Sequence, residues 1–507
     1  MGLKDRLGSW FRGATTPTDR TPAPDAPLAA PAPHDAHWIP PTTPLPAGRY
    51  LFLVEAIPPN YAGRTSSILA KIQAFSTQPG VDCEIVVIGY SADLPRAIAS
   101  IRARRVIDAS VPIRALYDLL DPTGTETEPG EVVEHIADDG HRVVNDVSAR
   151  GIARHSCRYA AGDAKPVAET FRDSTGRLLF HRTRTADEQP PGRVRDTVLV
   201  GSGAEEATAM PWPMFVRSLL DRLVGERPGP VFASVEARVV DRITLGWRNR
   251  AVRQVYVLHN PHLLPPYDDI DRIRGGFKGV LSRGGEVTTV FLTQAQRADA
   301  EAHYGPSDTW WVIPHAARQT APPTGEPRDP GLIVMVGRLH SQKQMSLAIR
   351  AMAQVTQVVP GARLEIYGEG DQEVELQELI SELGLEASIR LAGYTTNVDA
   401  VYQRATLSLL TSEYEGLGLV LVESLANGCP AIACDVRYGP ADIVTDGVNG
   451  RLTPPGSVAA LAEAIVSCLD DPVSWAAMSR AAPDIRSRFS RELFLNRWAT
   501  LYRSLAR

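Results

Sequence analysis

The sequence predicts an α/β protein with two doubly wound, Rossmann-like units and an antiparallel β module inserted into the first unit. Three observations lead to this fold class. Short apolar runs alternate with amphipathic helical stretches in two parts of the chain, which is typical of parallel sheets. A central stretch holds strand-like segments split by Asp139-Gly140 and Thr175-Gly176, and such pairs favour hairpins. A linker containing Pro, Gly and Arg over residues 320–330 separates the two α/β units.

The composition limits the class of protein. The chain has 507 residues, of which 44% are hydrophobic and 22% are charged, so disorder cannot dominate. At about 150 residues per domain, this length suggests about three folded parts. The formal net charge of −6 argues against a nucleic-acid binder that works by bulk charge, although a local basic groove is not excluded.

The cysteines and the apolar runs indicate the cellular compartment that we expect for the protein. No CxxC pair occurs among the five scattered cysteines, so we expect neither a disulfide framework nor a structural zinc site, and a reducing cytoplasm fits better. No stretch of about 18 apolar residues is present, so we expect no membrane span. The cysteines are Cys83, Cys157, Cys429, Cys434 and Cys468.

Residues 1–47 are predicted to form a Pro- and Ala-rich tether outside the fold, because so few apolar side chains cannot offset the entropy of ordering it. Leu3, Leu7, Trp10 and Phe11 have the spacing of a short amphipathic helix that could lie on the inner face of an anionic membrane. The alternative, which we prefer at this length, is a frayed terminus with incidental apolar residues.

The first α/β unit begins with strands at 49–56 and 84–89 and a helix at 66–75 between them, which together predict a βαβ unit. In the module, charged residues and Thr alternate with Val, Ile and Leu, so one face should meet solvent or a partner. After it, buried-strand runs are expected at 197–200, 231–234, 254–259, 288–293 and 309–313.

The second unit opens with a strand at 331–337, has a helix at 373–383, and leads into a helical end at 474–505. Two doubly wound units should hold ligands between them, at the carboxyl ends of their strands. Further strands are expected at 362–367, 389–391, 407–410 and 431–433. The predicted domains are 48–120 with 196–320, the inserted module 121–195, the second unit 321–485, and a C-terminal helix 486–507 that packs back on the first unit.

The densest group of chemically capable residues spans 412–423, where a strand runs into a glycine-bearing loop and then a helix. Gly416 and Gly418 let the backbone approach a ligand closely, and the helix N-terminus behind them favours a phosphate. Glu415 precedes this helix. Glu423 lies in the apolar run LVLVESL, where a buried carboxylate needs a partner such as a ligand hydroxyl.

The segment EGLGLVLVESLANGCPAIACDVRYGPADIVTDGVNGRLTPPG resembles the C-terminal half of family-4 retaining glycosyltransferases. Glu415 and Glu423 match that family's E-x7-E motif, and Gly337-Arg338-Leu339 with Lys343 matches its GR-L-x-x-x-K element. The run ANGCPAIACDVRYGP and the inserted module are similar to a narrower group. That group comprises the poly(glycerol- or ribitol-phosphate) α-glycosyltransferases of wall teichoic acid and the accessory-secretion glycosyltransferases of serine-rich adhesins.

The resemblance implies a GT-B fold and a role for each matching residue. Arg338 and Lys343 would neutralise the donor diphosphate as UDP leaves. Glu415 would hold the hydroxyls of the donor sugar, and Glu423 those of the ribose. His259, at the end of the strand QVYVL, matches the histidine near the reacting sugar, with a purely structural histidine as the alternative. The implied catalytic set is Glu415, Arg338, Lys343 and His259, and the donor-binding set is Glu423, Gly416, Leu417, Gly418, Gly393, Tyr394 and Gly63.

Several matches are incomplete. Where the family commonly has Gly-Gly, this chain has Ala62-Gly63, so the close backbone approach depends on Gly63, and Arg64 becomes a candidate acceptor contact together with His262. For Tyr394, plain loop packing is an equal alternative. His315 takes a position often held by Asn, and we interpret it first as a packing residue.

The resemblance implies a reaction without a metal or another cofactor, since Arg338 and Lys343 supply the positive charge. Asp269-Ile270-Asp271 is a DxD string, a weak metal signal in a loop rich in Pro and Arg. No GxxxxGK, HExxH or GxSxG motif occurs in the sequence.

The predicted function is retaining transfer of glucose or N-acetylglucosamine from a UDP-sugar to a hydroxyl of a polyol-phosphate, teichoic acid-type polymer. The alternatives are an O-glycosyltransferase of a serine-rich surface protein and a non-catalytic acceptor-binding partner, which usually loses the Glu pair or the Arg/Lys pair that this chain keeps. The module would bind the acceptor or join copies of the chain into a homo-oligomer.

Overall fold

The computed structural model describes residues 44–58, 63–91, 93–120, 131–148, 152–163, 165–173, 175–186, 194–200, 208–321 and 326–506. The N-terminal positions Leu3, Leu7, Trp10 and Phe11 lie outside the described residues. The last residues of the predicted tether belong to the fold, because Leu45 is buried in the core and the carbonyl of Pro46 accepts a hydrogen bond from the Tyr50 hydroxyl. None of the helices in the described part of the chain has the length and apolarity that crossing a membrane requires.

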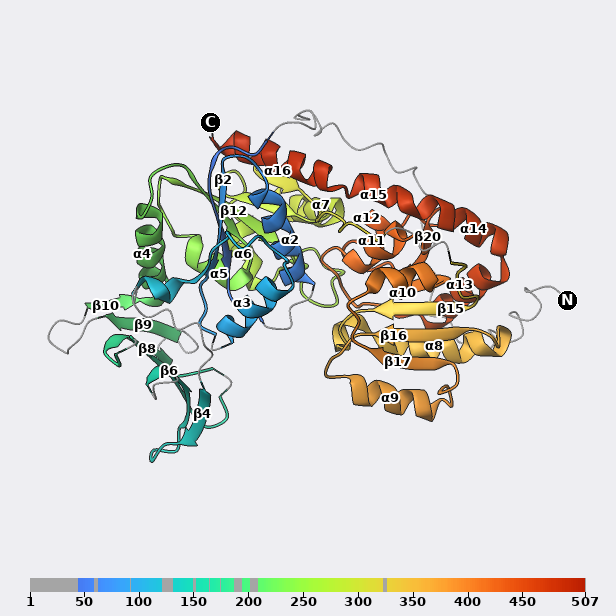
Figure 1. Cartoon of the computed structure of the whole chain (residues 1–507), viewed down its shortest axis with the longest axis horizontal. Coiled ribbons are helices and arrows are strands. Elements are labelled where there is room, and N and C mark those ends of the chain that lie inside the picture. Colours follow the sequence, from blue (N-terminus) through green and yellow to red (C-terminus); the bar gives the residue numbers. More distant parts are fainter. Residues whose placement is uncertain are drawn as a thin grey trace. The chain divides into compact units, whose positions relative to one another are not determined.

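The first α/β unit is built on a seven-stranded parallel sheet with the order β14-β13-β12-β11-β1-β2-β3 (Figure 1). The chain order therefore reverses between β1 and β11, and a doubly wound sheet binds its ligands beside such a point. The strands are β1 (Gly48–Val54), β2 (Val81–Val87), β3 (Ile113–Ala115), β11 (Val231–Val235), β12 (Val252–Leu258), β13 (Thr288–Phe291) and β14 (Trp310–Val312). The helices are α2 (Arg64–Ser76), α3 (Leu94–Ala103), α4 (Trp212–Gly225), α5 (Arg238–Thr244), α6 (Gly275–Leu281) and α7 (Gln294–Tyr304).

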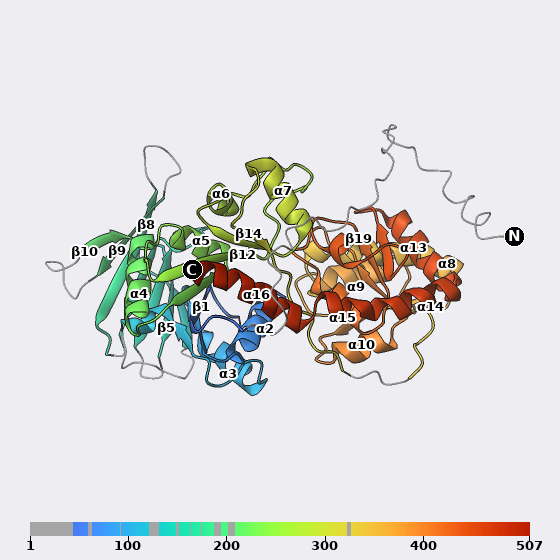
Figure 2. The same cartoon turned by 90° about the horizontal axis from the view of Figure 1, so that it is seen from above.

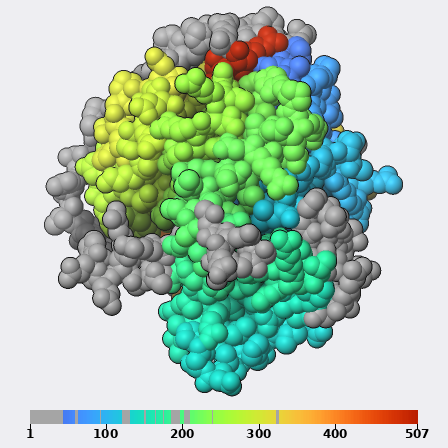
Figure 3. All heavy atoms as spheres, turned by 90° about the vertical axis from the view of Figure 1, so that its left-hand side faces the viewer, coloured from blue at the N-terminus to red at the C-terminus, as the bar shows by residue number. Residues whose placement is uncertain are grey.

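The inserted module is one antiparallel sheet, as predicted, with its seven strands in simple chain order from β10 to β4. In Figure 3 the strands β4 to β8, drawn in cyan and teal, lie in the lower part of the visible face. The bounds are β4 (Glu131–Ile136), β5 (Arg142–Val147), β6 (Ala153–Tyr159), β7 (Ala168–Arg172), β8 (Leu178–Ala186), β9 (Val194–Val200) and β10 (Thr208–Pro211).

The prediction that residues 197–200 return to the parallel sheet is wrong, because they belong to β9 and pair antiparallel with β8 and β10. Val198 is fully buried while Leu199 is 41% exposed, which is the alternation of a sheet covered on one face. The apolar run TVLV did not reveal this difference. The module therefore extends to Pro211, just before α4.

The second α/β unit has a six-stranded parallel sheet with the order β17-β16-β15-β18-β19-β20, which is the strand order of a dinucleotide-binding fold. Its chain order reverses between β15 and β18. The strands are β15 (Leu332–Val336), β16 (Arg363–Tyr367), β17 (Ile389–Gly393), β18 (Leu407–Leu410), β19 (Ala431–Cys434) and β20 (Gly450–Thr453). The helices are α8 (Met345–Val358), α9 (Glu373–Glu382), α10 (Val398–Arg404), α11 (Leu419–Ala426), α12 (Pro440–Ile443) and α13 (Val458–Asp470).

The helical end of the chain is divided into α14 (Pro472–Ala481), α15 (Ile485–Arg488) and α16 (Arg491–Ala506). Figure 2 shows α16 beside α2 and β1 of the first unit. The ring of Tyr502 meets Tyr50 edge-on at 5.0 Å, and the ring of Trp498 meets Phe75 at 5.9 Å. The aromatic face of α16 thus completes the core of the first unit, next to one of the two points where chain order reverses.

Candidate active site

The loops that follow β15 and β18 bring Lys343 against Glu415. The Lys343 Nζ atom lies 2.5 Å from Oε1 of Glu415, and the Ser412 hydroxyl donates to the same oxygen at 2.7 Å. Glu415 is 7% exposed, so its carboxylate is held in one position by two donors. Two residues that the sequence assigned to one site, 72 positions apart, are therefore in direct contact.

Hydrogen bonds to backbone carbonyls join these two loops to each other. The Glu413 N–H donates to the carbonyl of Gln342 at 2.8 Å, and the Gln342 side-chain amide donates to the carbonyl of Tyr414 at 2.9 Å. The Thr411 hydroxyl donates to the carbonyl of Lys343 at 2.9 Å. The site thus lies on a rigid frame at the carboxyl ends of adjacent strands, where its geometry is fixed before a ligand binds.

Arg338 follows β15 in the same loop, but its side chain is exposed and makes no hydrogen bond or ion pair with the described residues. The backbone of this loop approaches Gly368 so closely that a Cβ there would lie 1.8 Å from the carbonyl oxygen of Gly337. The loop is therefore fixed while the guanidinium remains available to an anion.

Glu423 differs from its sequence-based description. Its side chain is 24% exposed and lies 3.6 Å from the guanidinium of Arg318, so it has a protein partner as well as an open side. Arg318 also forms a bidentate pair with Asp399, at 3.0 and 2.7 Å. Burial raises the pKa of Glu423, and Arg318 opposes that shift. Sequence reasoning missed Arg318, in the segment after β14, and Asp399, in α10, because neither residue carries a motif.

The glycine loop of residues 416–418 lies against the first unit. A Cβ on Gly416 would lie 2.0 Å from the carbonyl oxygen of His259 at the end of β12, so only glycine fits there. Gly418 has a φ of 87° directly before α11. Leu417 is 3% exposed, and its side chain packs in the hydrophobic core.

Gly393 is held by a backbone hydrogen bond at the end of β17, whereas the next residue, Tyr394, is exposed. The carbonyl of Gly393 accepts a hydrogen bond from the backbone N–H of Gly368 at 2.9 Å, which links the end of β17 to the loop that follows β16. Tyr394 is 57% exposed, which leaves part of its side chain open to a ligand.

His259 belongs to a buried charged cluster that only the structure shows. Its Nε2 atom lies 2.7 Å from Oε2 of Glu236, and Oε1 of Glu236 accepts from both Lys71 Nζ at 2.8 Å and the Ser234 hydroxyl at 2.6 Å. Burial raises the pKa of Glu236, but Lys71 and His259 together hold it well below its usual value. The carboxylate can therefore only accept, and His259 carries its proton on Nε2.

This assignment leaves Nδ1 of His259 as a hydrogen-bond acceptor. The atom is buried and has no partner among the described residues. Burial lowers the pKa of His259, while Glu236 opposes the shift, so the ring is neutral near pH 7. Buried polar atoms are seldom left unpaired, and a ligand hydroxyl is a suitable donor. His315 stacks on this ring at 5.2 Å and is buried, which agrees with its packing interpretation.

Gly63 and Arg64 begin α2 at the opening beside this cluster. A pocket at the ends of β1 and β11 is lined by residues that include Arg64, Thr65 and Glu236. Gly63 has a φ of 51°, and a Cβ there would meet open space. Arg64 is exposed and its charge lowers the pKa of His259, which places it near the histidine.

The prediction that His262 contacts an acceptor is wrong. Its side chain is fully buried, with its ring stacked on Tyr438 at 5.8 Å, so it cannot reach a ligand in this conformation. Of the DxD aspartates, Asp271 pairs with His303 at 2.6 Å, and Asp269 accepts from the backbone N–H of Asp271. Neither aspartate belongs to a group that could hold a metal among the described residues.

Residues 318–485 match the model of the family described as glycosyl transferases group 1. A poly(glycerol-phosphate) alpha-glucosyltransferase of Bacillus subtilis strain 168 is 31% identical over 246 residues, which are 48% of this chain and 36% of the relative. The GtfA subunit of a UDP-N-acetylglucosamine–peptide N-acetylglucosaminyltransferase of Streptococcus gordonii is 36% identical over 149 residues, which are 28% of this chain and 29% of the relative.

A solved structure of a mutant of S. aureus TarM, in complex with Fondaparinux, alpha-GlcNAc-glycerol and UDP, superimposes with a TM-score of 0.68 at 16% identity, covering 90% of this chain and 99% of that chain. At that identity the likeness establishes the fold, and the chain has the predicted GT-B architecture. The chain matches less than half of the length of the curated relatives reported above.

Proposed function

We propose that the protein is a retaining glycosyltransferase that moves glucose or N-acetylglucosamine from a UDP-sugar to a hydroxyl of a polyol-phosphate polymer. The observation that carries this proposal is the contact between Lys343 and Glu415 at the point where chain order reverses, with the unpaired Arg338 in the same loop. A leaving diphosphate needs positive charge, and a sugar needs a fixed hydrogen-bond acceptor. The two loops supply both.

In this proposal Arg338 and Lys343 stabilise the negative charge that develops on UDP, so the transfer itself needs no metal. The open side of Glu423 accepts hydrogen bonds from the ribose hydroxyls, and Arg318 and Asp399 keep its carboxylate in place. The exposed ring of Tyr394 lies against the uracil.

The acceptor attacks on the face of the sugar from which UDP departs, and the leaving phosphate takes the acceptor proton. Lys343 already neutralises Glu415, which favours Glu415 as a hydrogen-bond acceptor over Glu415 as a nucleophile. The unpaired Nδ1 of His259 accepts a hydrogen bond from a hydroxyl of the donor sugar.

The relatives support two acceptor classes for this site. One is named for poly(glycerol-phosphate) and the other for a peptide. We favour the polyol phosphate because of the longer match, 246 residues against 149. A non-catalytic partner is disfavoured, since Arg338, Lys343, Glu415 and Glu423 are all present.

A panel of UDP-sugars tests the proposal. UDP release is measured from the full chain with poly(glycerol phosphate), poly(ribitol phosphate) or a serine-rich peptide. We expect release with UDP-glucose or UDP-N-acetylglucosamine, stimulated by a polyol phosphate and reduced by Glu415→Gln. If the peptide stimulates UDP release and neither polyol phosphate does, the acceptor is a protein and not a polyol phosphate. No release with any donor, while UDP still binds, would favour the non-catalytic partner.

The module has an edge suited to a second copy of the chain or to the acceptor. Strand β4 is at the end of the sheet, where Val132 is 58% and Ile136 is 66% exposed. Unpaired edges with apolar side chains favour association. We propose homo-oligomerisation there, tested by light scattering of Ile136→Lys. An unchanged oligomer mass would contradict it. Vesicle sedimentation of a chain lacking residues 1–43 tests the remaining possibility that the N-terminal segment contacts a membrane, and unchanged sedimentation would contradict that contact.

A further inference from the structure

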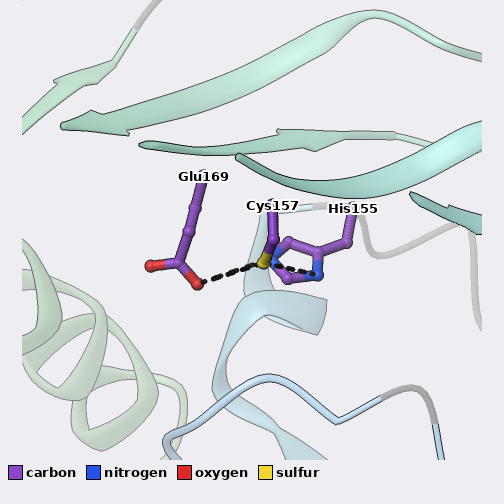
Figure 4. A group of neighbouring side chains, drawn as sticks. All are labelled: His155, Cys157 and Glu169. Atoms are coloured by element: carbon purple, nitrogen blue, oxygen red, sulfur yellow. Dashed lines mark hydrogen bonds and ion pairs between the residues drawn. The ribbon is translucent and has the colours of Figure 1, made fainter. Parts of the chain in front are cut away.

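Three side chains with metal-binding atoms gather on the inner face of the module sheet (Figure 4). His155 and Cys157 are two positions apart on β6, so they face the same side of the sheet. Glu169 on β7 pairs directly opposite Cys157. The antiparallel register therefore brings together an imidazole, a thiol and a carboxylate that no sequence motif connects.

The distances among the three ligand atoms fit one small metal ion. Cys157 Sγ lies 3.4 Å from His155 Nε2 and 3.8 Å from Glu169 Oε1, and Nε2 lies 3.5 Å from Oε1. In a tetrahedral zinc site, bonds of about 2.0–2.3 Å separate such ligands by about 3.3–3.6 Å. The three atoms thus already stand near the required spacing, and a bound ion would need shifts of only a few tenths of an ångström.

Neighbouring side chains hold these ligands in place. Arg182 donates to Oε2 of Glu169 at 2.7 Å, which leaves Oε1 directed to His155 and Cys157. The rings of Tyr90 and Phe171 lie 3.9 and 4.3 Å from the imidazole of His155. Residues that orient ligands in this way are a regular part of metal sites.

We propose that His155, Cys157 and Glu169 bind one Zn²⁺ ion, with water completing a tetrahedral site. Thiolate, imidazole and carboxylate together suit zinc among the common divalent ions. The thiol gives up its proton when the ion binds and supplies one negative charge, while the Glu169 carboxylate is shared between the ion and the guanidinium groups of Arg182 and Arg184. This inference does not depend on the proposed sugar transfer, because the cluster lies on β6 and β7 and shares no residue with the donor site.

Contrary to the sequence-based expectation of no structural zinc site, the proposed ion would stabilise the module, because the cluster lies where the module meets the first α/β unit. Tyr90, in the loop between β2 and α3, packs on His155 and donates a hydrogen bond to Asp146 of β5. Asp146 lies opposite His155 in the ladder, and its Oδ1 atom is buried without a hydrogen bond, which adds negative charge on the same face. The ion would tie β6 and β7 together directly under this contact.

The test uses the full chain, reduced and stripped of metal by a chelator. Zn²⁺ or Co²⁺ is then added, and bound metal is measured by elemental analysis together with the thiolate-to-cobalt charge-transfer absorption. We expect one ion per chain and a charge-transfer band. Cys157→Ala should abolish the band and weaken binding by more than about a hundredfold, beyond what loss of a merely orienting residue causes. Cys468 is a buried cysteine in α13, outside the cluster, so the Cys468→Ala variant should bind the metal as the wild type does.

Thermal unfolding supplies a second measurement. Zinc should raise the Tm of the wild type, and the rise should grow as the zinc concentration exceeds the dissociation constant. The Tm of Cys157→Ser should not change when zinc is added. The serine variant keeps the side-chain size, so it serves if the alanine variant fails to fold. Absence of stoichiometric metal in the wild type would overturn the proposal, and so would a cobalt band that survives in both Cys157 variants.

Discussion

Glu236 Oε2 lies 2.7 Å from Nε2 of His259, and the same carboxylate holds the buried ammonium of Lys71. The Lys71 Nζ atom in turn lies 3.6 Å from the centre of the Trp498 ring on α16. The C-terminal helix, the first sheet and the candidate catalytic histidine are thus connected through a single buried carboxylate. In the proposed reaction Glu236 is a positioning residue, because it fixes the tautomer and orientation of His259 without reaching the sugar.

Replacement of Glu236 by Gln should therefore lower kcat by about a hundredfold. The amide removes the charge that fixes the tautomer of His259 and leaves the Lys71 ammonium without its counter-ion. The KM for the UDP-sugar should change by less than about threefold, since the diphosphate contacts remain. Steady-state UDP release measures both constants.

The matched control is Glu84→Gln. Glu84 is a buried glutamate of the same sheet, paired with Arg49 at 3.1 Å, but outside the proposed site. Breaking either buried pair should cost about 3–5 kcal/mol of stability, so both variants are compared below their unfolding temperatures. Equal kcat losses in the two variants would assign Glu236 a purely structural role.

Lys343→Met should reduce kcat by about a hundred- to a thousandfold, the usual effect of removing one preorganised group that stabilises developing charge. The variant also leaves Glu415 with Ser412 as its remaining side-chain donor. The exposed Lys278 of α6 supplies the control, because Lys278→Met changes net charge equally. If Lys343→Met retains wild-type kcat, the charge on UDP must be balanced elsewhere.

Gly416→Ala should lower activity by about a hundredfold, because a Cβ 2.0 Å from the carbonyl oxygen of His259 forces the glycine loop and β12 apart. The glycine loop includes Leu417 and Gly418, so the donor contacts would shift with it. Gly361→Ala is the control, since a Cβ at that position meets nothing within 4 Å. Activity within about twofold of the wild type in Gly416→Ala would contradict the close approach.

Local patterns and the resemblance were sufficient to predict both parallel sheets, the inserted module and the assignment of Lys343 and Glu415 to one site, but not the ion pair between these two side chains. The sequence-based predictions failed for features that depend on which strands become neighbours in a sheet. The apolar run at 197–200 fits a parallel sheet as well as β9, because both bury valine in the same way. The pattern His155-x-Cys157 predicts one shared face, but Glu169 joins it only through the register of β6 and β7. Lys71 and Glu236 are 165 residues apart, so no spacing rule could connect them.

His262 should make the stability of the protein depend on pH. Burial lowers its pKa from 6.5 to about 4, so the ring is neutral in the folded state while the unfolded chain takes up a proton below pH 6.5. The contribution of His262 to the free energy of unfolding is therefore constant above about pH 6.5. It decreases by about 3 kcal/mol in all as the pH falls towards 4. Urea unfolding at pH 7.5 and pH 4.5 measures the difference.

His262→Leu removes this titration while nearly conserving volume. Since neither ring nitrogen of His262 has a partner among the described residues, the variant should change stability at pH 7.5 by less than about 1 kcal/mol. It should lose less stability than the wild type between pH 7.5 and 4.5, while His315, whose pKa burial lowers to about 3, still titrates in both proteins. Identical pH dependence in the two proteins would mean that His262 is protonated within the fold, and a hydrogen-bond acceptor for its ring N–H groups would then have to exist.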